Sequence, residues 1–492
     1  MIEFVVLIPV VAALLCLLPQ LRPRHAEVIA LLGALLSSIA LLASALLAGD
    51  ISKTPITGLF GMIRIDALGL LFAAVTSMVA LFAFAYSRSY MREEVKEGVF
   101  EEKRLGSYYS FMLFFLSSML LVTMASDLLT TWAALESTTL ASVFLISFYD
   151  NKESVEAAWK YFIICSLGIT IALVGLMILA YGMQQAGVQE SFAWENALTN
   201  AKAINPLYLK IAFAFIFVGY GTKVGLVPLH VWLPDAHSQA PTPVSALLSG
   251  VLLNAALYSI LRLYPIAAQT PDALAFISSL FIFFGLISLA LASLRLFSQE
   301  NYKRLLAYSS IENMGIICLG VGIGGPLGML AALFHMISHS IVKPLAFFMG
   351  GAISLLYGTK EISKITGIAQ KMPLLGQAFV LVNVGITGSL PFGTFISEII
   401  LLAAALATGN YIIAALLVLF TTVAFGSFLL KSSHMAFGPF TSAKLHNFEP
   451  DFMMKSAIFG LFILGIIAGL LMPQVLISLI NPAISVLLLR GS

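Results

Sequence analysis

The sequence predicts an all-α polytopic membrane protein with about fourteen transmembrane helices, including two inverted five-helix repeats that each contain a broken helix. Of its 492 residues, 60% are hydrophobic and only 10% are charged, whereas soluble globular proteins carry about 25% charged residues. Apolar stretches of about 20 residues, the length that crosses a bilayer, recur along the chain. Two of these stretches combine glycines, a proline and one charged residue, a pattern typical of the broken helices that build ion sites in transporters.

The predicted spans leave no room for a soluble domain, so we treat residues 1–492 as a single transmembrane domain. Within the N-terminal region, 1–106, the spans cover residues 2–18, 26–48 and 66–87. The first repeat, 107–264, contains the spans 107–125, 128–149, 155–183, 206–233 and 243–264. The second repeat, 273–433, contains the spans 273–297, 303–322, 327–357, 373–408 and 411–433. The C-terminal region, 453–492, begins with a span at 453–471.

The two termini need separate treatment. The first apolar stretch has no basic residues before it, so we interpret it as a true span rather than a cleaved signal peptide. The last apolar segment, 473–490, is interrupted by Pro473 and Pro482. This segment predicts either a helix along the membrane interface or a fifteenth span.

The distribution of Lys and Arg predicts that the N-terminus lies outside the cell, because cytoplasmic loops are enriched in these residues. In this orientation the inside loops and helix ends hold 18 of the 26 Lys and Arg residues, Lys444 among them. Arg490 lies near the end of the chain. The outside holds five of these residues: Lys53, Arg64, Lys202, Lys210 and Arg262. The two remaining lysines, Lys223 and Lys343, belong to neither surface.

Composition also limits the possible ligands. The net charge is only +2 and the chain has no basic tail, so nucleic acid is excluded as a partner. The three cysteines, Cys16, Cys165 and Cys318, lie in apolar stretches and form no C-x-x-C pair. This arrangement argues against an iron–sulfur cluster or a structural zinc site, so we expect no cofactor and no metal in this chain.

Two ionisable residues lie deep inside the first repeat. Glu136 is about ten residues from either end of its span, roughly 15 Å along a helix, which is too far for its side chain to reach water. Lys223 lies in "FVGYGTKVGLVPLHVWLP", where glycines and Pro228 weaken the helix. Such residues cost at least about 2.5–3.5 kcal/mol in a membrane and are functional candidates. The alternatives are a neutral glutamate that joins two helices and a lysine that extends to the cytosolic interface.

Three ionisable residues share one helix face in "FHMISHSIVKPLAFFMGG", residues 334–351. His335, His339 and Lys343 are spaced i, i+4, i+8 and therefore fall within roughly 80° of one another. Imidazole titrates near neutral pH, and burial lowers the affinity of a lysine for its proton, so this row predicts a proton relay. A metal site, for which no third ligand is evident, and packed core histidines are the alternatives.

A second broken helix carries Glu398, in "GITGSLPFGTFISEIILLAAAL". Pro391 interrupts this span, and Gly388 and Gly393 flank the proline. One broken helix with one charge therefore occurs in each half of the chain. This correspondence predicts an internal repeat of spans 4–8 and 9–13, with ion sites near the middle of the membrane.

These features, in this order, resemble the antiporter-like subunits of respiratory complex I and the Mrp-type cation/proton antiporters. The resemblance covers nearly the whole chain and is strongest in "KVGLVPLHVWLPDAHSQAPTPVSALLSG", "NYKRLLAYSSIENMGII" and the span-11 stretch quoted above. Within that superfamily, "DAHSQAPTPVSALLSGVLLN" and "YSSIENMG" are most similar to the membrane subunits of energy-converting NiFe hydrogenases. These include hydrogenase-4, formate hydrogenlyase and the archaeal membrane-bound hydrogenase with its sulfur-reducing relative.

The resemblance implies a set of ion-translocating residues: Glu136, Lys223, His335, His339, Lys343 and Glu398. Five further residues are accessory candidates: His230, Asp235, His237, Asn254 and Glu312. Asn254 is a departure, because many members of the superfamily carry a lysine or histidine there on span 8. Asparagine does not titrate near neutral pH, so the first half-channel lacks one proton-holding step.

The resulting prediction is a proton-translocating, non-catalytic subunit of a membrane-bound redox complex, with Na⁺ as an alternative ion. The resemblance implies that a NiFe centre and Fe–S clusters reside in partner subunits. Those partners would be other membrane subunits and a peripheral hydrogenase-like arm, and lipid would surround the chain in the cell membrane. The alternative functions are an Mrp-type cation/proton antiporter, a membrane subunit of an NADH–quinone oxidoreductase, and a structural subunit that does not conduct.

Overall fold

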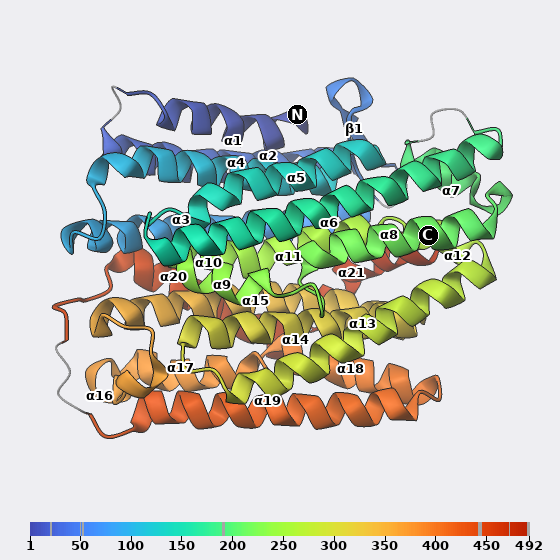
Figure 1. The fold of residues 1–492 in the computed structure, drawn as a ribbon. Coiled ribbons are helices and arrows are strands. Elements are labelled where there is room, and N and C mark those ends of the chain that lie inside the picture. The colour runs from blue at the N-terminus through green and yellow to red at the C-terminus, as the bar shows by residue number, and fades with distance from the viewer. Residues whose placement is uncertain are drawn as a thin grey trace.

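The computed structural model describes residues 1–19, 22–49, 51, 54–188, 192–440, 445–471 and 473–489. Long helices run side by side between two ends of the molecule (Figure 1). Among the described residues, twelve helices are long and apolar enough to cross a membrane, and four shorter apolar helices accompany them. The predicted all-α fold is confirmed. Three residues of the charge count, Lys53, Lys444 and Arg490, lie outside the described residues.

Three helices and a hairpin precede the first half: α1 (Glu3–Cys16), α2 (Pro23–Leu47), β1 (Ile56–Gly58), β2 (Ile63–Ile65) and α3 (Ala67–Lys96). The carboxylate of Asp66 caps α3 by accepting a hydrogen bond from the Gly69 N–H at 2.9 Å. Helix α3 continues well beyond residue 87, its predicted end. Its last turns are stabilised by charge, since Arg92 pairs with the buried Glu27 of α2.

The first half contains α4 (Leu105–Met124), α5 (Leu128–Ile146), α6 (Lys152–Gln185), α7 (Trp194–Thr199), α8 (Pro206–Val224), α9 (Trp232–Gln239), α10 (Thr242–Leu247), a π-helix (Leu248–Leu252), α11 (Leu253–Leu261) and α12 (Tyr264–Ala268). The predicted break in 206–233 is present, because α8 ends before Gly225. That glycine has a φ of 82°, a left-handed conformation that favours glycine because it has no Cβ.

The second half contains α13 (Pro271–Phe297), α14 (Tyr302–Ile323), α15 (Gly325–Tyr357), α16 (Ile368–Lys371), α17 (Pro373–Gly385), α18 (Gly393–Ala407) and α19 (Tyr411–Phe437). The predicted break in 373–408 lies between α17 and α18. It repeats the local pattern of the first break: Gly388 has a φ of 74°, and a proline follows three residues later in both halves (G-L-V-P and G-S-L-P). Each half crosses the molecule an odd number of times. The second half therefore starts at the end opposite to the start of the first half, and the two halves have inverted orientations.

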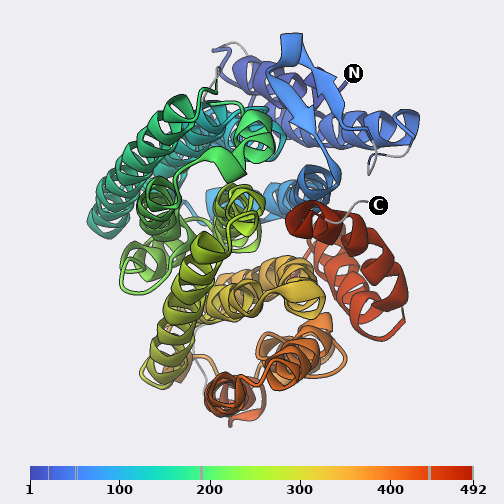
Figure 2. The same ribbon diagram turned by 90° about the vertical axis from the view of Figure 1, so that its right-hand side faces the viewer.

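The C-terminal segments are α20 (Phe452–Ile466), a π-helix (Ile467–Leu471) and α21 (Pro473–Leu488). Asp451, just before α20, accepts a hydrogen bond at 2.5 Å from Ser89 near the end of α3. Ser485 of α21 instead lines a pocket with Asp66, at the start of α3. The chain from Asp451 to Ser485 therefore leads from one end of the molecule to the other, so α21 is not a fifteenth span that returns across it. Figure 2 shows α21 at the end that carries the β-hairpin.

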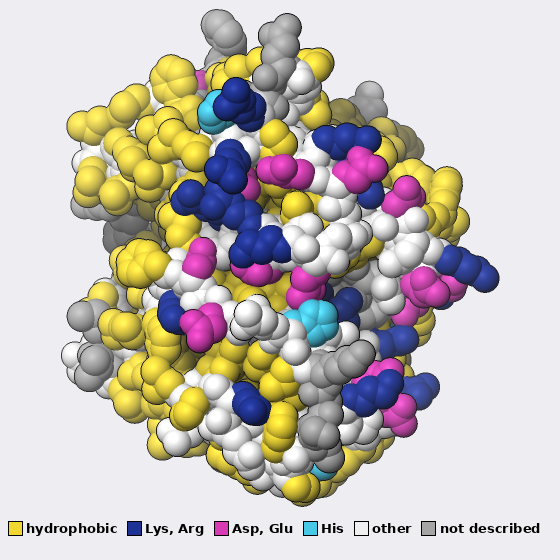
Figure 3. Space-filling model, turned by 90° about the vertical axis from the view of Figure 1, so that its left-hand side faces the viewer, with side chains coloured by type: hydrophobic (Ala, Val, Ile, Leu, Met, Phe, Trp, Pro, Cys, Tyr) yellow, Lys and Arg dark blue, Asp and Glu magenta, His cyan; other side chains and the backbone are white. Residues whose placement is uncertain are grey.

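Charge is concentrated at the ends of the molecule. At the end where α3 terminates, Figure 3 shows Lys, Arg, Asp and Glu gathered over the centre and hydrophobic side chains around the edge. Large exposed apolar residues such as Leu167 (61%) and Phe283 (60%) lie on the sides of the long helices. This distribution fits a polytopic membrane protein whose sides contact lipid.

Candidate functional site

The first-half site joins Glu136 of α5 to Lys223 of α8 through a hydroxyl group. Lys223 is fully buried, and its Nζ donates to Thr139 Oγ1 at 2.5 Å and to the Tyr161 hydroxyl at 3.0 Å. Thr139 Oγ1 donates in turn to one carboxylate oxygen of Glu136 at 3.2 Å, while the other oxygen accepts from Ser166 Oγ at 2.8 Å. The two predicted residues therefore lie together, but a threonine bridges them in place of a direct ion pair.

The break after α8 fixes the position of Lys223. The lysine is on the last turn of α8, which Gly225 terminates. The indole N–H of Trp232, from the start of α9, donates at 2.8 Å to the Thr222 carbonyl oxygen at the end of α8. The same indole packs against Tyr161, with 4.9 Å between ring centroids. The broken helix thus holds the lysine near its hydroxyl partners.

The three ionisable residues of α15 are all buried, with His335 and His339 each 1% exposed and Lys343 0% exposed. Lys343 Nζ donates to the Leu306 carbonyl oxygen at 3.0 Å and to Ser309 Oγ, both on α14. Both acceptors are neutral, and within the described part of the chain no carboxylate lies at ion-pair distance from Lys343. The second lysine, like the first, is bonded to uncharged oxygen atoms.

The two histidines have different surroundings. His335 Nε2 is 2.9 Å from Asn313 Oδ1 of α14, and His335 Nδ1 is 2.9 Å from Ser397 Oγ of α18. Neither ring nitrogen of His339 has a partner among the residues that the structure describes. His335 therefore connects α14 to α18, and His339 lies between His335 and Lys343 on the helix face.

Glu398 lies next to Ser397 on α18, at the second broken helix. Its carboxylate packs directly against the Cα of Gly388, where a Cβ would collide with it. One Glu398 oxygen and both carboxylate oxygens of the buried Glu312 on α14 have no partner within the described ranges. Buried polar atoms of this kind require water or an ion as a partner, so the second half contains a group of carboxylates suited to a hydrated path.

Several hydroxyl groups and one amide lie in and around the π-helix. Asn254 Nδ2 donates to Ser340 Oγ at 2.7 Å and to the Gly250 carbonyl oxygen at 2.9 Å. Ser249 and Ser310 form a hydrogen bond at 2.7 Å. Ser340 follows His339 in the sequence, and Ser310 follows Ser309, the hydrogen-bond partner of Lys343. Single π-turns inside helices are frequent at functional sites.

The other accessory candidates divide into two kinds. His237 on α9 is fully buried, and neither of its ring nitrogens has a hydrogen-bond partner among the described residues. Nδ1 of His230 also has no hydrogen-bond partner among those residues. Asp235 instead forms ion pairs with Arg304 at 2.8 Å and Lys160 at 3.2 Å. These two ion pairs connect α6, α9 and α14 at one end of the molecule.

Two cations assigned to the inside surface by the Lys and Arg count are buried or half-buried. Lys303 is only 2% exposed, and its Nζ donates to the Ala240 carbonyl oxygen at 2.9 Å. Lys360, in the segment after α15, donates to the Ser238 carbonyl oxygen at 3.1 Å, and burial lowers its pKa. The count separated only Lys223 and Lys343 from the surfaces, because hydropathy does not show how loops fold over a lysine.

Arg262, counted as an outside cation, is also buried. It forms a two-point ion pair with Asp66, at 2.5 and 2.8 Å, and lies 4.8 Å from the ring centroid of Trp194. Burial raises the pKa of Asp66, but the charge and hydrogen bonds of Arg262 outweigh burial and hold that pKa below its ordinary value. This pair fastens the start of α3 to the end of α11.

The sequence prediction missed the hydroxyl and amide partners of the ionisable residues: Thr139, Tyr161, Ser166, Ser309, Asn313 and Ser397. Polar uncharged residues are common in helices and carry no distinctive spacing, although the stretch "YSSIEN" was visible. In the described part of the chain, no three His, Cys, Asp or Glu residues form a group that could hold a metal ion. The three cysteines are free and buried.

Comparison with known proteins places these residues in a family context. Residues 125–426 match the family described as "NADH:quinone oxidoreductase/Mrp antiporter, TM". The chain is 38% identical over 377 residues to a hydrogenase-4 component F homolog of Methylacidiphilum infernorum, covering 76% of this chain and 79% of that protein. It is 31% identical over 348 residues to hydrogenase-4 component B of Escherichia coli, covering 68% of this chain and 50% of that protein. The fold matches a chain of an archaeal membrane-bound sulfane sulfur reductase with a TM-score of 0.85 and 22% identity, covering 99% and 97% of the two chains.

Proposed function

Because this chain belongs to the NADH:quinone oxidoreductase/Mrp antiporter family of membrane subunits, we propose that it translocates protons within a multisubunit redox complex. The observation that supports this most directly is the row of buried and half-buried titratable groups and hydroxyls from Glu136 to Glu398. An ordinary membrane core would replace these groups with apolar residues, because each ionisable group is costly in the bilayer. The chain itself supplies binding and transfer of protons, without a redox centre.

The first step of the proposed path is the unit of Glu136, Thr139 and Lys223. The threonine hydroxyl accepts from the ammonium and donates to the carboxylate, so a change in the charge of Glu136 reaches Lys223 through one hydrogen-bonded group. A carboxylate stabilises a buried ammonium, and loss of that carboxylate charge favours proton release. Glu136 is half-buried beside the exposed Leu140 and Phe144, where a neighbouring membrane subunit would reach it.

The middle of the path has no titratable residue on span 8, since Asn254 occupies that place. We propose that water bridges this interval, supported by the hydroxyls of Ser249 and Ser340 and by the unpaired nitrogens of His237. Asn254 can hold such water by its free amide oxygen. The first half therefore delivers protons to the second half and does not hold one at span 8.

The second half would store and release the proton. Lys343 is the proposed store, His339 and His335 pass the proton along α15, and Glu398 controls release at the break between α17 and α18. The contact of His335 with Ser397, the neighbour of Glu398, supports this order. The two halves, 107–264 and 273–433, then act as input and output parts of one domain.

We propose the hydrogenase type of complex because the relative with 38% identity is a hydrogenase-4 component homolog. In such a complex, partner subunits would hold a NiFe centre and Fe–S clusters, and their electron transfer would drive this chain. We place it in the cell membrane with the N-terminus outside, supported by the concentration of Lys and Arg at the opposite end (Figure 3). Other membrane subunits and a peripheral redox arm are its proposed partners.

The experiment is proton uptake by inverted vesicles that contain the intact complex, driven by its electron donor, with a pH-sensitive dye. Uptake that persists without Na⁺ and collapses with a protonophore supports proton translocation. Uptake that requires Na⁺ favours the cation/proton antiporter alternative. Redox turnover with no ion movement would favour the non-conducting structural role.

A further inference from the structure

A pair of buried charges lies between the first-half site and one end of the molecule. We define the hairpin end as the end that carries β1, β2 and the start of α3 (Figure 2). We propose that Arg262, held by Asp66, seals the first-half site against the hairpin end, so that a proton on Lys223 can leave only toward the second half. This inference rests on the proposed function and adds the element that gives the proton path its direction.

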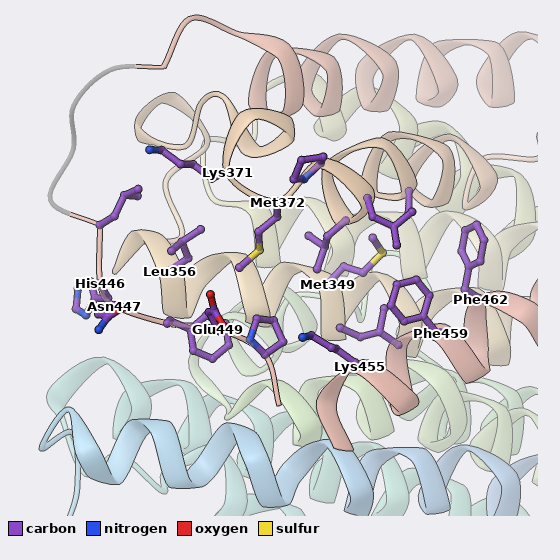
Figure 4. A pocket seen from close by; sticks show the side chains of 18 residues that line it. Met349, Leu356, Lys371, Met372, His446, Asn447, Glu449, Lys455, Phe459 and Phe462 are labelled. Carbon is purple, nitrogen blue, oxygen red and sulfur yellow. The ribbon is translucent and has the colours of Figure 1, made fainter. Parts of the chain in front are cut away.

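Cavities lie at both ends of the molecule. At the end where α3 terminates, a cavity of about 660 Å³ lies between α15, α17 and α20, and its described lining includes no residue of the proposed path (Figure 4). At the hairpin end, a cavity of about 360 Å³ has Arg64, Asp66, Trp194 and Arg262 in its lining. The second cavity therefore contacts the buried charge pair directly.

A small internal void shares two lining residues with the cavity at the hairpin end. The void measures about 10 Å³, and every residue that lines it is buried. Trp194 and Arg262 line both the void and the cavity. The volume of the void is close to the smallest that holds one water molecule, about 10–15 Å³. Trp194 and Arg262 therefore form the partition between the void and the cavity.

The void lies next to the first-half site. Three residues with hydroxyl groups line it: Thr131, Tyr220 and Ser259. On α8, Tyr220 precedes Lys223 by three residues, a rise of about 4.5 Å. On α5, Thr131 precedes Glu136 by five residues, a rise of about 7.5 Å. Both helices begin at the hairpin end (Figure 1), so the void lies between the site and the partition.

Arg262 is unsuited to pass a proton. Its guanidinium donates to both carboxylate oxygens of Asp66, at 2.5 and 2.8 Å, and to the Tyr258 hydroxyl at 2.6 Å. A guanidinium does not lose its proton in proteins, and its positive charge opposes the approach of a proton or another cation. The ring centroid of Trp194 lies 4.8 Å from this guanidinium and 5.4 Å from that of Arg64, so a second positive charge stands at the same partition.

The hydrogen-bond partners of Arg262 also direct their groups away from proton transfer. Asp66 accepts from the Gly69 N–H in addition to the guanidinium, and a carboxylate paired with an arginine keeps its charge. The Tyr258 hydroxyl donates to the Thr123 carbonyl oxygen at 2.8 Å, so its proton points to the backbone. A proton in the void would therefore have to displace the ion pair to reach the cavity.

The test measures passive proton leak, which requires no electron donor, in vesicles that contain the reconstituted full complex. A pH gradient is imposed in the presence of K⁺ and valinomycin, and an enclosed pH-sensitive dye reports its decay. The variant is Asp66→Asn with Arg262→Gln, which removes both charges together so that neither is left unpaired. We expect its leak rate to rise at least about tenfold, which corresponds to a barrier lowered by about 1.36 kcal/mol.

Two further variants locate the leak. Glu27→Gln with Arg92→Gln removes a two-point ion pair of a buried carboxylate that joins α2 to the other end of α3, and it should leave the leak at the wild-type rate. Lys223→Gln, added to the Asp66 and Arg262 substitutions, should return the leak toward the wild-type rate, because the first half then has no lysine to receive the proton. A leak that persists with Lys223→Gln would overturn the proposal.

Assembly of each variant is checked by size-exclusion chromatography. Where the double variant does not assemble, Arg262→Lys decides the question, because it keeps a cation beside Asp66 but one that can release its proton, and an increased leak supports the proposal. A wild-type leak rate in every assembled variant at Arg262 refutes the seal. Donor-driven uptake by the wild-type complex tests the proposed function independently, since the seal can fail while protons are still translocated.

Discussion

Replacement of Lys343 by arginine separates proton storage from positive charge. Lys343 is fully buried, and its amine meets two neutral acceptors, the Leu306 carbonyl oxygen at 3.0 Å and Ser309 Oγ. Arginine keeps the charge, but its guanidinium does not lose its proton in proteins. Positioned proton transfer contributes about 10²–10⁴-fold to a rate, so we expect Lys343→Arg to reduce transport at least about 100-fold.

The structure also gives the effect of Lys343→Arg on stability. Guanidinium carries five donors, and the site offers two acceptors, so several donors would lack partners. Each unpartnered buried donor costs about 1–3 kcal/mol. We therefore expect a lower melting temperature, and assembly must be checked by size-exclusion chromatography before transport is compared.

The assay is donor-driven proton uptake into vesicles, with redox turnover measured in parallel. Lys343→Ala sets the level of complete loss. Lys303→Arg is the matched control, because Lys303 is 2% exposed on the adjacent α14 and, among the described residues, its hydrogen bond goes to a backbone carbonyl oxygen. Uptake near the wild-type level in an assembled Lys343→Arg complex would refute proton storage and assign Lys343 a structural charge.

Four further predictions follow from named contacts. Glu136→Gln should strongly reduce uptake while the complex assembles, and wild-type uptake would assign Glu136 a structural role. Gly388→Ala should abolish uptake and lower the melting temperature, because its Cβ would collide with the carboxylate on α18; Gly409→Ala, with a similar φ of 75° and open space around it, should show only the backbone cost. Asp66→Asn should cost about 3–5 kcal/mol in thermal unfolding, as the buried Arg262 loses its partner. Because Arg262 holds the pKa of Asp66 below its ordinary value, this difference should be complete above about pH 4 and disappear as pH falls through the folded pKa; a difference independent of pH would contradict the ion pair. The chain purified alone should contain no nickel, iron or flavin by elemental and absorbance analysis, and stoichiometric metal would reopen the histidines as ligands.

The sequence predicted the architecture because membrane insertion leaves a strong one-dimensional pattern. Apolar length identifies crossings, and the expected spans agree with the helices to within a few residues, apart from the extension of α3 and the C-terminal segments. Both broken helices were predicted, since glycine and proline act locally on the backbone. Of the two C-terminal expectations, the fifteenth span was wrong, because Ser485 near the end of α21 lies beside Asp66, at the end of the molecule opposite the start of α20.

The sequence also identified the ionisable residues inside the membrane-spanning region, because a charge inside an apolar stretch is conspicuous. It did not determine how they meet. Only the tertiary structure placed Thr139 between Glu136 and Lys223 and packed Glu398 against Gly388.

Burial of the remaining charged residues likewise depends on the tertiary structure. Arg262 and Lys303 lie at helix ends, where hydropathy assigns them to water, yet packing against other elements buries both. Local sequence fixes where a helix starts, ends and breaks, because those events depend on neighbouring residues and on the bilayer. The oxygen atoms that pair with a buried charge come from residues far apart in the sequence, such as 66 and 262. Only the folded chain brings these residues together.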